Sequence, residues 1–190
     1  MRLENLFLRI TAIALCCQTA SPQLVPKAVR SDRATALILE KQEGERRVHR
    51  PAGTTLGTAP FILKFDPQNG GTKHLVMFTE TLPSGTAIPR HKHSGSEEIL
   101  ILQSGRSRVH LGDIVREVGA GATVFIPEDT WISVEVVGSE PVGLVAIFAE
   151  PGFEEYMRAI SVREGEPNAP MSRAELDTVR AQHPHAVAYK

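Results

Sequence analysis

Apolar and polar positions form short runs through the middle of the chain, and turn residues separate these runs. The runs cover residues 34–39, 61–65, 74–81, 98–103, 106–111, 114–118, 122–126, 131–137 and 142–149. Gly112-Asp113 and Pro127-Glu128-Asp129 are turn sequences between neighbouring runs. Many short strands at this spacing are typical of a sandwich or barrel and not of an α/β fold. We therefore predict an all-β fold whose double-sheet barrel covers residues 34–150.

The pattern changes to helical spacing near the end of the chain. Phe153, Tyr156 and Met157 form an apolar stripe with the period of a short helix. Ser172 and Glu175 have the spacing of a capping box, which predicts a second helix that ends near residue 182. Residues 151–190 are thus predicted as a helical C-terminal extension.

The first twenty residues have the features of a signal peptide. Arg2 and Arg9 precede an apolar run over residues 10–17, and small residues follow it. The run is too short to span a bilayer, so no transmembrane segment is expected. Export to the periplasm or the extracellular space is the prediction, and a cytoplasmic location is the alternative if this segment is not a signal. Residues 21–33 contain two prolines and scattered charges, which predicts a linker.

Composition agrees with one globular domain and argues against several kinds of partner and site. The chain has 190 residues, 42% of them hydrophobic, and a formal net charge of −1. Such a charge gives no basis for binding nucleic acid or an anionic membrane surface. Cys16 and Cys17 are the only cysteines, so the rest of the chain can form neither a disulfide framework nor a cysteine-ligated zinc site.

The candidate chemistry lies between residues 82 and 105. His91 and His93 are two positions apart, so on a strand both imidazoles project to one face. Glu98 starts the next apolar run and reaches the same place if the two strands pair. Two neutral imidazoles and a carboxylate form a ligand set for a divalent first-row metal. His183 and His185, near the end of the second predicted helix, are not assigned to a metal.

The spacing of five residues in this stretch resembles the first signature motif of the cupin superfamily. Those residues are Gly85, His91, His93, Glu98 and Gly105. The resemblance implies a single-domain cupin, that is, a double-stranded β-helix of the jelly-roll kind with a metal or small-ligand site inside the barrel. Cupins include dioxygenases, decarboxylases, isomerases and non-catalytic binding proteins, so the resemblance leaves the reaction open.

The second cupin motif is degenerate here. Gly121 and Pro127 fit it, and Asp129 replaces a glycine, which aspartate tolerates because it adopts left-handed conformations more readily than most residues. Ile132 stands where the family places its fourth metal ligand, and Val136 stands at an asparagine position. The sequence therefore predicts either a three-ligand site with open positions or a weakened site that stays empty.

Two function classes remain open. The first is a metal-dependent cupin in which His91, His93 and Glu98 hold iron, manganese, nickel or zinc beside a small organic ligand, as in a dioxygenase-like oxidoreductase or an isomerase. The second is a metal-free module that binds a small molecule or a sugar. Its predicted pocket residues are Leu100, Leu102, Trp131 and Ile132. No catalytic residue is assigned; Glu80 and His110 are the candidates for a general base.

Two further patterns concern the surface. Ile99 and Ile101 alternate with Leu100 and Leu102, so both faces of this strand are apolar. An N-terminal strand or a second subunit must cover the outer face, and we predict a homodimer. The charge-rich residues 44–50 are interpreted as a solvated face and not as an anion site.

Overall fold

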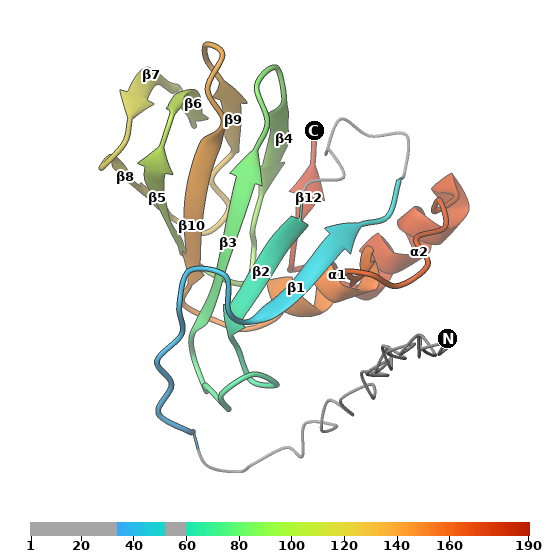
Figure 1. The fold of residues 1–190 in the computed structure, drawn as a ribbon. Helices are drawn as coiled ribbons and strands as arrows, with labels where there is room; N and C mark the ends of the chain where they lie inside the picture. The colour runs from blue at the N-terminus through green and yellow to red at the C-terminus, as the bar shows by residue number, and fades with distance from the viewer. Residues whose placement is uncertain (1–33, 52–59) are drawn as a thin grey trace, which may run out of the picture.

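The computed structural model describes residues 34–51 and 60–190 (Figure 1). The predicted signal peptide, residues 1–20, and linker, residues 21–33, lie outside the described residues. Within the described ranges, no helix has both the length and the apolar character needed to cross a membrane.

Two antiparallel sheets enclose the core, which confirms the predicted all-β double-sheet barrel (Figure 1). One sheet has seven strands in the order β11-β1-β2-β3-β10-β5-β8, and the other has five in the order β12-β4-β9-β6-β7. The strands are β1 (Glu45–His49), β2 (Pro60–Phe65), β3 (Val76–Leu82), β4 (Ala87–Lys92), β5 (Glu98–Ser104), β6 (Arg106–Leu111), β7 (Ile114–Gly119), β8 (Thr123–Ile126), β9 (Ile132–Val136), β10 (Val142–Phe148), β11 (Ser161–Arg163) and β12 (Ala188–Tyr189).

Alternation of apolar side chains explains how the two sheets close on each other. On β5 the side chains of Glu98, Leu100 and Leu102 are buried, whereas Ile99 faces outward. On β9 the buried positions are Ile132, Val134 and Val136, again two residues apart. The inward faces of both sheets therefore build one continuous core.

Two turn positions show why the chain needs particular residues there. Gly105 links β5 to β6 with a φ of +74°, and a Cβ at this position would lie 2.5 Å from the carbonyl oxygen of Pro141. A side chain is therefore excluded both by conformation and by space. Asp129 has a φ of 58°, which confirms the left-handed conformation expected where the second motif usually has glycine.

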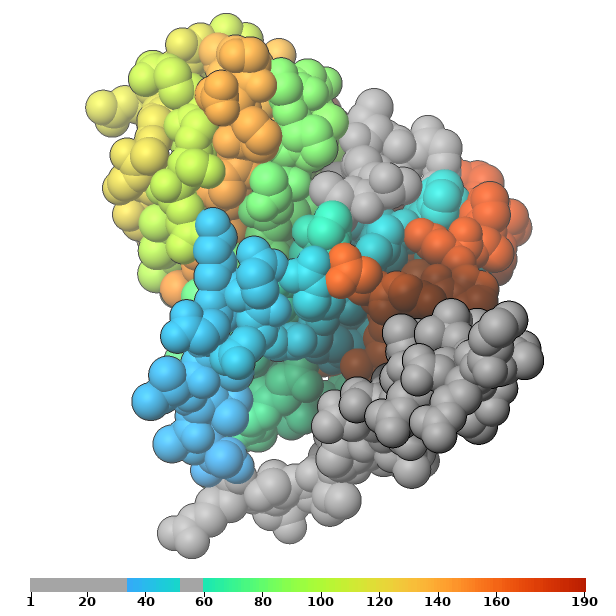
Figure 2. All heavy atoms as spheres, viewed as in Figure 1, coloured from blue at the N-terminus to red at the C-terminus, as the bar shows by residue number. Residues whose placement is uncertain are grey.

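The C-terminal extension contains the two predicted helices, α1 (Phe153–Ala159) and α2 (Arg173–Gln182). The capping box at Ser172 and Glu175 is confirmed, with both reciprocal hydrogen bonds present. The extension also provides two strands that were not predicted: β11 pairs with β1, and β12 pairs with β4. It therefore extends one edge of each sheet, and Figure 2 shows its orange and red atoms beside the cyan atoms of β1.

The charge-rich stretch over residues 44–50 is not a solvated face. It forms β1, whose inward residues Glu45, Arg47 and His49 are all buried. Arg47 and Arg158 donate hydrogen bonds to the Glu45 carboxylate at 2.6 and 2.8 Å, and Arg158 also pairs with the fully buried Asp66 at 2.6 Å. The interpretation was wrong because alternation on a strand sends every second charge inward, where these partners neutralise it.

The start of the barrel also differs from the expectation. Residues 34–39 form no strand, and the described part of the barrel begins with β1. The outer face of β5 remains partly open: Ile99 and its cross-strand partner Phe125 on β8 are 39% and 53% exposed. Because no described strand covers these two residues fully, the homodimer stays a prediction.

Candidate metal centre

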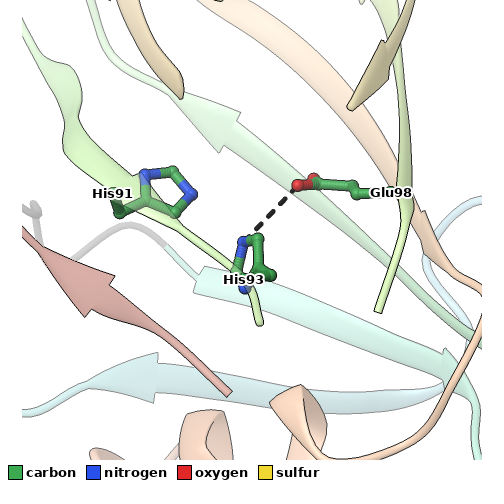
Figure 3. Close-up of side chains that lie close together, drawn as sticks. All are labelled: His91, His93 and Glu98. Carbon is green, nitrogen blue, oxygen red and sulfur yellow. Dashed lines mark ion pairs between the residues drawn. The ribbon is translucent and has the colours of Figure 1, made fainter. Parts of the chain in front are cut away.

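The three predicted ligands meet at one end of the barrel, between the two sheets. His91 lies on β4, His93 directly follows that strand, and Glu98 begins β5 (Figure 3). One ligand atom from each residue lies within 4.8 Å of the others, and His93 Nε2 is 3.5 Å from Glu98 Oε2. All three residues are buried. The spacing of two between the histidines therefore has the predicted effect of directing both rings to one place.

Asp129, one of the residues that depart from the second motif, holds the turn that carries His93. Asp129 donates its backbone N–H to the carbonyl oxygen of His93 at 2.7 Å. Its carboxylate accepts hydrogen bonds from Lys92 Nζ at 2.6 Å and from Ser94 Oγ at 3.0 Å. Lys92 thus points away from the centre, and its charge anchors the outer side of the turn.

Backbone carbonyls define the tautomer of both imidazoles. His91 Nδ1 lies 2.7 Å from the carbonyl oxygen of Pro89, and His93 Nδ1 is hydrogen-bonded to the carbonyl oxygen of Ala186. A carbonyl oxygen can only accept, so each Nδ1 carries the proton and each neutral ring keeps a free lone pair on Nε2. In metal sites, histidine ligands are oriented by such hydrogen bonds from their other ring nitrogen. The contact to Ala186 makes the C-terminal extension part of the centre.

Two buried polar atoms at the centre have no hydrogen-bond partner among the described residues: His93 Nε2 and Glu98 Oε2. Such groups are costly in an apolar interior unless something pairs with them. A cation between the three ligand atoms would satisfy both atoms at once. The residues present therefore fit a divalent metal.

Burial changes the proton affinities of the three ligands. Desolvation lowers the pKa of His91, and together with the nearby His91 it lowers the pKa of His93 to about 4. Desolvation raises the pKa of the Glu98 carboxyl to about 8. Without a cation, all three groups are thus mostly neutral at neutral pH. A bound divalent ion would favour the carboxylate form of Glu98, so metal binding there must displace a proton.

Ile132 occupies the position of the missing fourth ligand. It is the cross-strand partner of His91 in the β4–β9 pairing and is 1% exposed. Its side chain cannot coordinate a metal, so the described chain offers three ligands and leaves other coordination positions open.

Comparisons with known proteins concern the family and the fold of the chain. Residues 78–148 match the family model of the cupin domain. A predicted oxalate decarboxylase from Thermotoga maritima has a similar fold: the TM-score is 0.52 and the identity 19%, over 60% of this chain and 100% of that structure. The chain carries a cupin domain. This confirms the family that the first motif indicated.

Other similarities are more limited. A protein from Klebsiella pneumoniae with a double-stranded β-helix domain has a TM-score of 0.43 and 20% identity, over 48% of this chain and 76% of that structure. An uncharacterised protein from Methanocaldococcus jannaschii is 33% identical over 70 residues, which are 37% of this chain and 56% of the relative. The match thus spans little more than half of that relative.

A cavity of about 50 Å³ adjoins the three ligands, and its lining includes residues of the cupin domain, of β1 and of the C-terminal extension. By this measure one water needs roughly 10 to 15 Å³, so the cavity has space for an ion with a ligand of a few non-hydrogen atoms. Most of its wall is apolar. The apolar wall residues are Phe78, Ile88, Leu100, Ile132, Val134, Leu144, Ala146, Phe148, Phe153, Met157 and Ile160.

The predicted pocket residues divide between the cavity and other places. Leu100 and Ile132 line the cavity, whereas Leu102 is fully buried in the core but does not line it. Trp131 directly precedes β9 and does not line the cavity, and Lys92 Nζ lies 5.6 Å from its ring centroid. Neighbouring residues on a strand face opposite ways, so Trp131 and Ile132 could not both have lined the lumen.

The candidate bases also separate. Glu80 lines the cavity, whereas His110 lies on β6 and borders a different groove, together with Glu135. Sequence reasoning missed His49 and Tyr189, which also line the cavity. Inward alternation along residues 45, 47 and 49 could have indicated His49. No pattern in the sequence indicated Tyr189, because its position at the cavity depends on the pairing of β12 with β4.

Proposed function

We propose that the cupin domain binds a divalent first-row metal through His91 Nε2, His93 Nε2 and the Glu98 carboxylate. The observation that supports this most strongly is the convergence of three buried ligand atoms within 4.8 Å, two of which have no hydrogen-bond partner in the described part of the chain. Iron, manganese, nickel and zinc all suit two imidazoles and one carboxylate. A small organic molecule in the cavity takes an open coordination position.

The proposed chemistry follows from the three metal ligands and from the apolar wall of the cavity. When bound, the metal supplies Lewis acidity and a coordination position for a ligand oxygen. The protein orients the imidazoles through the carbonyl groups of Pro89 and Ala186 and keeps bulk water away with apolar side chains. A metal-dependent oxidoreductase of the dioxygenase kind, or an isomerase, is the proposed class of activity.

One observation favours a second candidate function. The apolar side chain of Ile132 fills the fourth-ligand position, and all three ligands are neutral without a cation. A metal-free cupin that binds a small molecule in the same cavity has these properties too.

Metal content distinguishes the two candidates. The protein is expressed in rich medium, purified without a histidine tag and analysed by inductively coupled plasma mass spectrometry. The metal-dependent function predicts a stoichiometric first-row metal in the wild type and a loss of that metal in His93→Ala. His110→Ala is the matched control and should retain the metal, because His110 lies away from the cavity. A metal-free wild type that also fails to take up added metal would leave the binding module as the better description.

A further inference from the structure

A second polar pair lines the metal cavity. His49 on β1 and Glu80 on β3 both border it, with His49 Nε2 lying 3.6 Å from Glu80 Oε1. Their side chains are only 6% and 9% exposed. The pair is separate from the ligand cluster, which consists of His91, His93 and Glu98 alone among the described residues. The cavity is therefore bordered by the three predicted metal ligands and, separately, by the titratable pair His49 and Glu80.

His49 differs sharply from the other inward residues of its own strand. Glu45 and Arg47 have hydrogen-bonded partners at 2.6 to 2.9 Å. Both ring nitrogens of His49 are buried, yet neither has a hydrogen-bond partner among the described residues. The fold thus gains no hydrogen bond from this imidazole, although burying it is unfavourable. An unused donor and acceptor beside a cavity are suited to a ligand.

The imidazole is nevertheless held in place. Its ring packs on Phe61 with a centroid separation of 4.8 Å. The backbone carbonyl oxygen of His49 accepts a hydrogen bond from the Asn168 side chain. The backbone N–H of the next residue, Arg50, donates to the carbonyl oxygen of Ile160. Because the backbone and the ring are fixed on both sides, His49 presents its nitrogens at a defined position.

The other titratable side chains at the cavity are less suited to accept a proton from a ligand. His91, His93 and Glu98 would be engaged by the metal. Desolvation raises the pKa of Tyr189, so its phenol stays neutral and is a poor base. Glu80 Oε1 lies 3.6 Å from His49 Nε2, where a carboxylate would stabilise an imidazolium once it forms. His49 Nδ1 remains as the free lone pair.

We propose that His49 is the proton acceptor of this cavity and that Glu80 positions it. A weak acid of a few non-hydrogen atoms enters as the neutral molecule and gives up a proton. The bond between this proton and the ligand breaks, and its electron pair stays on the ligand. The proton forms an N–H bond at His49 Nδ1, so the products are a bound anion and an imidazolium beside Glu80. The inference rests on the proposed metal site, which would hold the anion.

The test uses acetohydroxamic acid, a small neutral acid that binds metals as its anion. Zinc is first titrated into metal-free wild type, His49→Gln, Glu80→Gln and the control His110→Gln. If the wild type binds no zinc, the proposed function fails and the acid is not added. If zinc binds, calorimetry of the acid at neutral pH in buffers of different ionisation enthalpy counts the protons released.

The wild type and His110→Gln should release almost no proton, because His49 keeps it. His49→Gln should bind zinc as the wild type does but release one proton per acid bound. Its affinity for the acid should fall about tenfold, the effect of one charge-assisted hydrogen bond. Glu80→Gln should release an intermediate amount. Equal proton release from wild type and His49→Gln would overturn the inference while leaving the metal site intact.

A measurement on the unaltered protein covers the case in which His49→Gln fails to fold. Nitrogen-15 spectra of the zinc-loaded wild type report the protonation of each imidazole. On saturation with the acid, the two His49 nitrogens should move from the separate shifts of a neutral ring to the similar shifts of an imidazolium. A His49 ring that stays neutral would refute its role as proton acceptor.

Discussion

The β1 network and the ligand cluster are both groups of buried ionisable residues, and they differ in how their charges are satisfied. The β1 network, made of Glu45, Arg47, Asp66 and Arg158, pairs each carboxylate with a guanidinium. The ligand cluster, His91, His93 and Glu98, contains no permanent cation. Burial alone would raise the pKa of Glu45, but hydrogen bonds and charge from Arg158, and hydrogen bonds from Arg47 and Asn69, lower it to about 2. Burial raises the pKa of Glu98 to about 8.

The difference indicates what each group is for. A carboxylate whose charge is already neutralised by arginine stabilises the arrangement of strands and helix around it. A carboxyl group that is buried without a cation is unfavourable as an anion until one arrives. The carboxylates of the β1 network are thus neutralised without a ligand, whereas the carboxyl group of the ligand cluster is not. The following predictions test this contrast, from the largest expected effect to the smallest.

Removing Arg158, which pairs with both Glu45 and Asp66, should have the largest effect on stability. Arg158→Ala leaves Asp66 and part of Glu45 buried without their cation, which should lower the free energy of unfolding by roughly 3 to 5 kcal/mol. Chemical denaturation measures this loss, and added metal should not restore it. The control Arg108→Ala breaks an exposed pair of ion contacts and should leave stability almost unchanged, because solvent screens exposed charges. Similar losses in both variants would contradict the contrast.

Restoring the family's fourth ligand should strengthen the ligand cluster. Ile132→His replaces a buried apolar side chain with a polar ring, so the metal-free protein should lose roughly 1 to 3 kcal/mol. Nickel or manganese should recover this loss, because a ligand that binds only the folded state stabilises it. Thermal melting of wild type, Ile132→His and His91→Ala, each with and without metal, measures both effects. If metal stabilises Ile132→His no more than it stabilises the wild type, these residues do not form a metal site.

The pH dependence of the metal-free protein should identify Glu98. A folded pKa of about 8 against an ordinary value of 4.5 means that stability from this group is highest at low pH and is lost as pH rises through about 8. His93, with its pKa lowered to about 4 from 6.5, acts in the opposite direction between those values. From pH 6.5 to 8 the Glu98 effect therefore acts without opposition from His93, at no more than about 1.4 kcal/mol per pH unit.

Glu98→Gln should remove this decline and also abolish stabilisation by metal. Denaturation curves at several pH values, recorded with a chelator, give the slope for each protein. Glu45→Gln is the matched substitution in the β1 network. It should lower stability at neutral pH, where Glu45 is ionised and paired, and should leave metal binding unchanged. A slope that persists in Glu98→Gln would assign it to another group.

The smallest stability effect is expected at the outer face of β5. Ile99→Ser and Phe125→Ser replace partly exposed residues and should change the free energy of unfolding by only about 0.5 kcal/mol. They should nevertheless weaken the predicted homodimer, because the two side chains are neighbours on an apolar surface. Sedimentation at micromolar concentration provides the measurement. A monomeric wild type would rule out a dimer of this strength.

Local patterns in the sequence were sufficient for several features of the structure. The short apolar runs predicted β2, β3 and the six strands from β5 to β10, and the capping box predicted the start of α2. The spacing between His91 and His93 predicted two rings on one face, and the left-handed conformation of Asp129 followed from its place in the motif. These features depend on neighbouring residues, so periodicity, capping and backbone preference are enough to specify them.

The tertiary structure decided which residues complete the site. Alternation shows that Trp131 and Ile132 face opposite ways, but only the pairing of β4 with β9 puts Ile132 beside His91. His49 reaches the cavity because β1 pairs with β2, and Ala186 reaches His93 because β12 pairs with β4 at the edge of the other sheet. A strand pattern defines two faces and leaves open which face is inside and which strand is its neighbour. Contacts between residues far apart in the sequence make that choice.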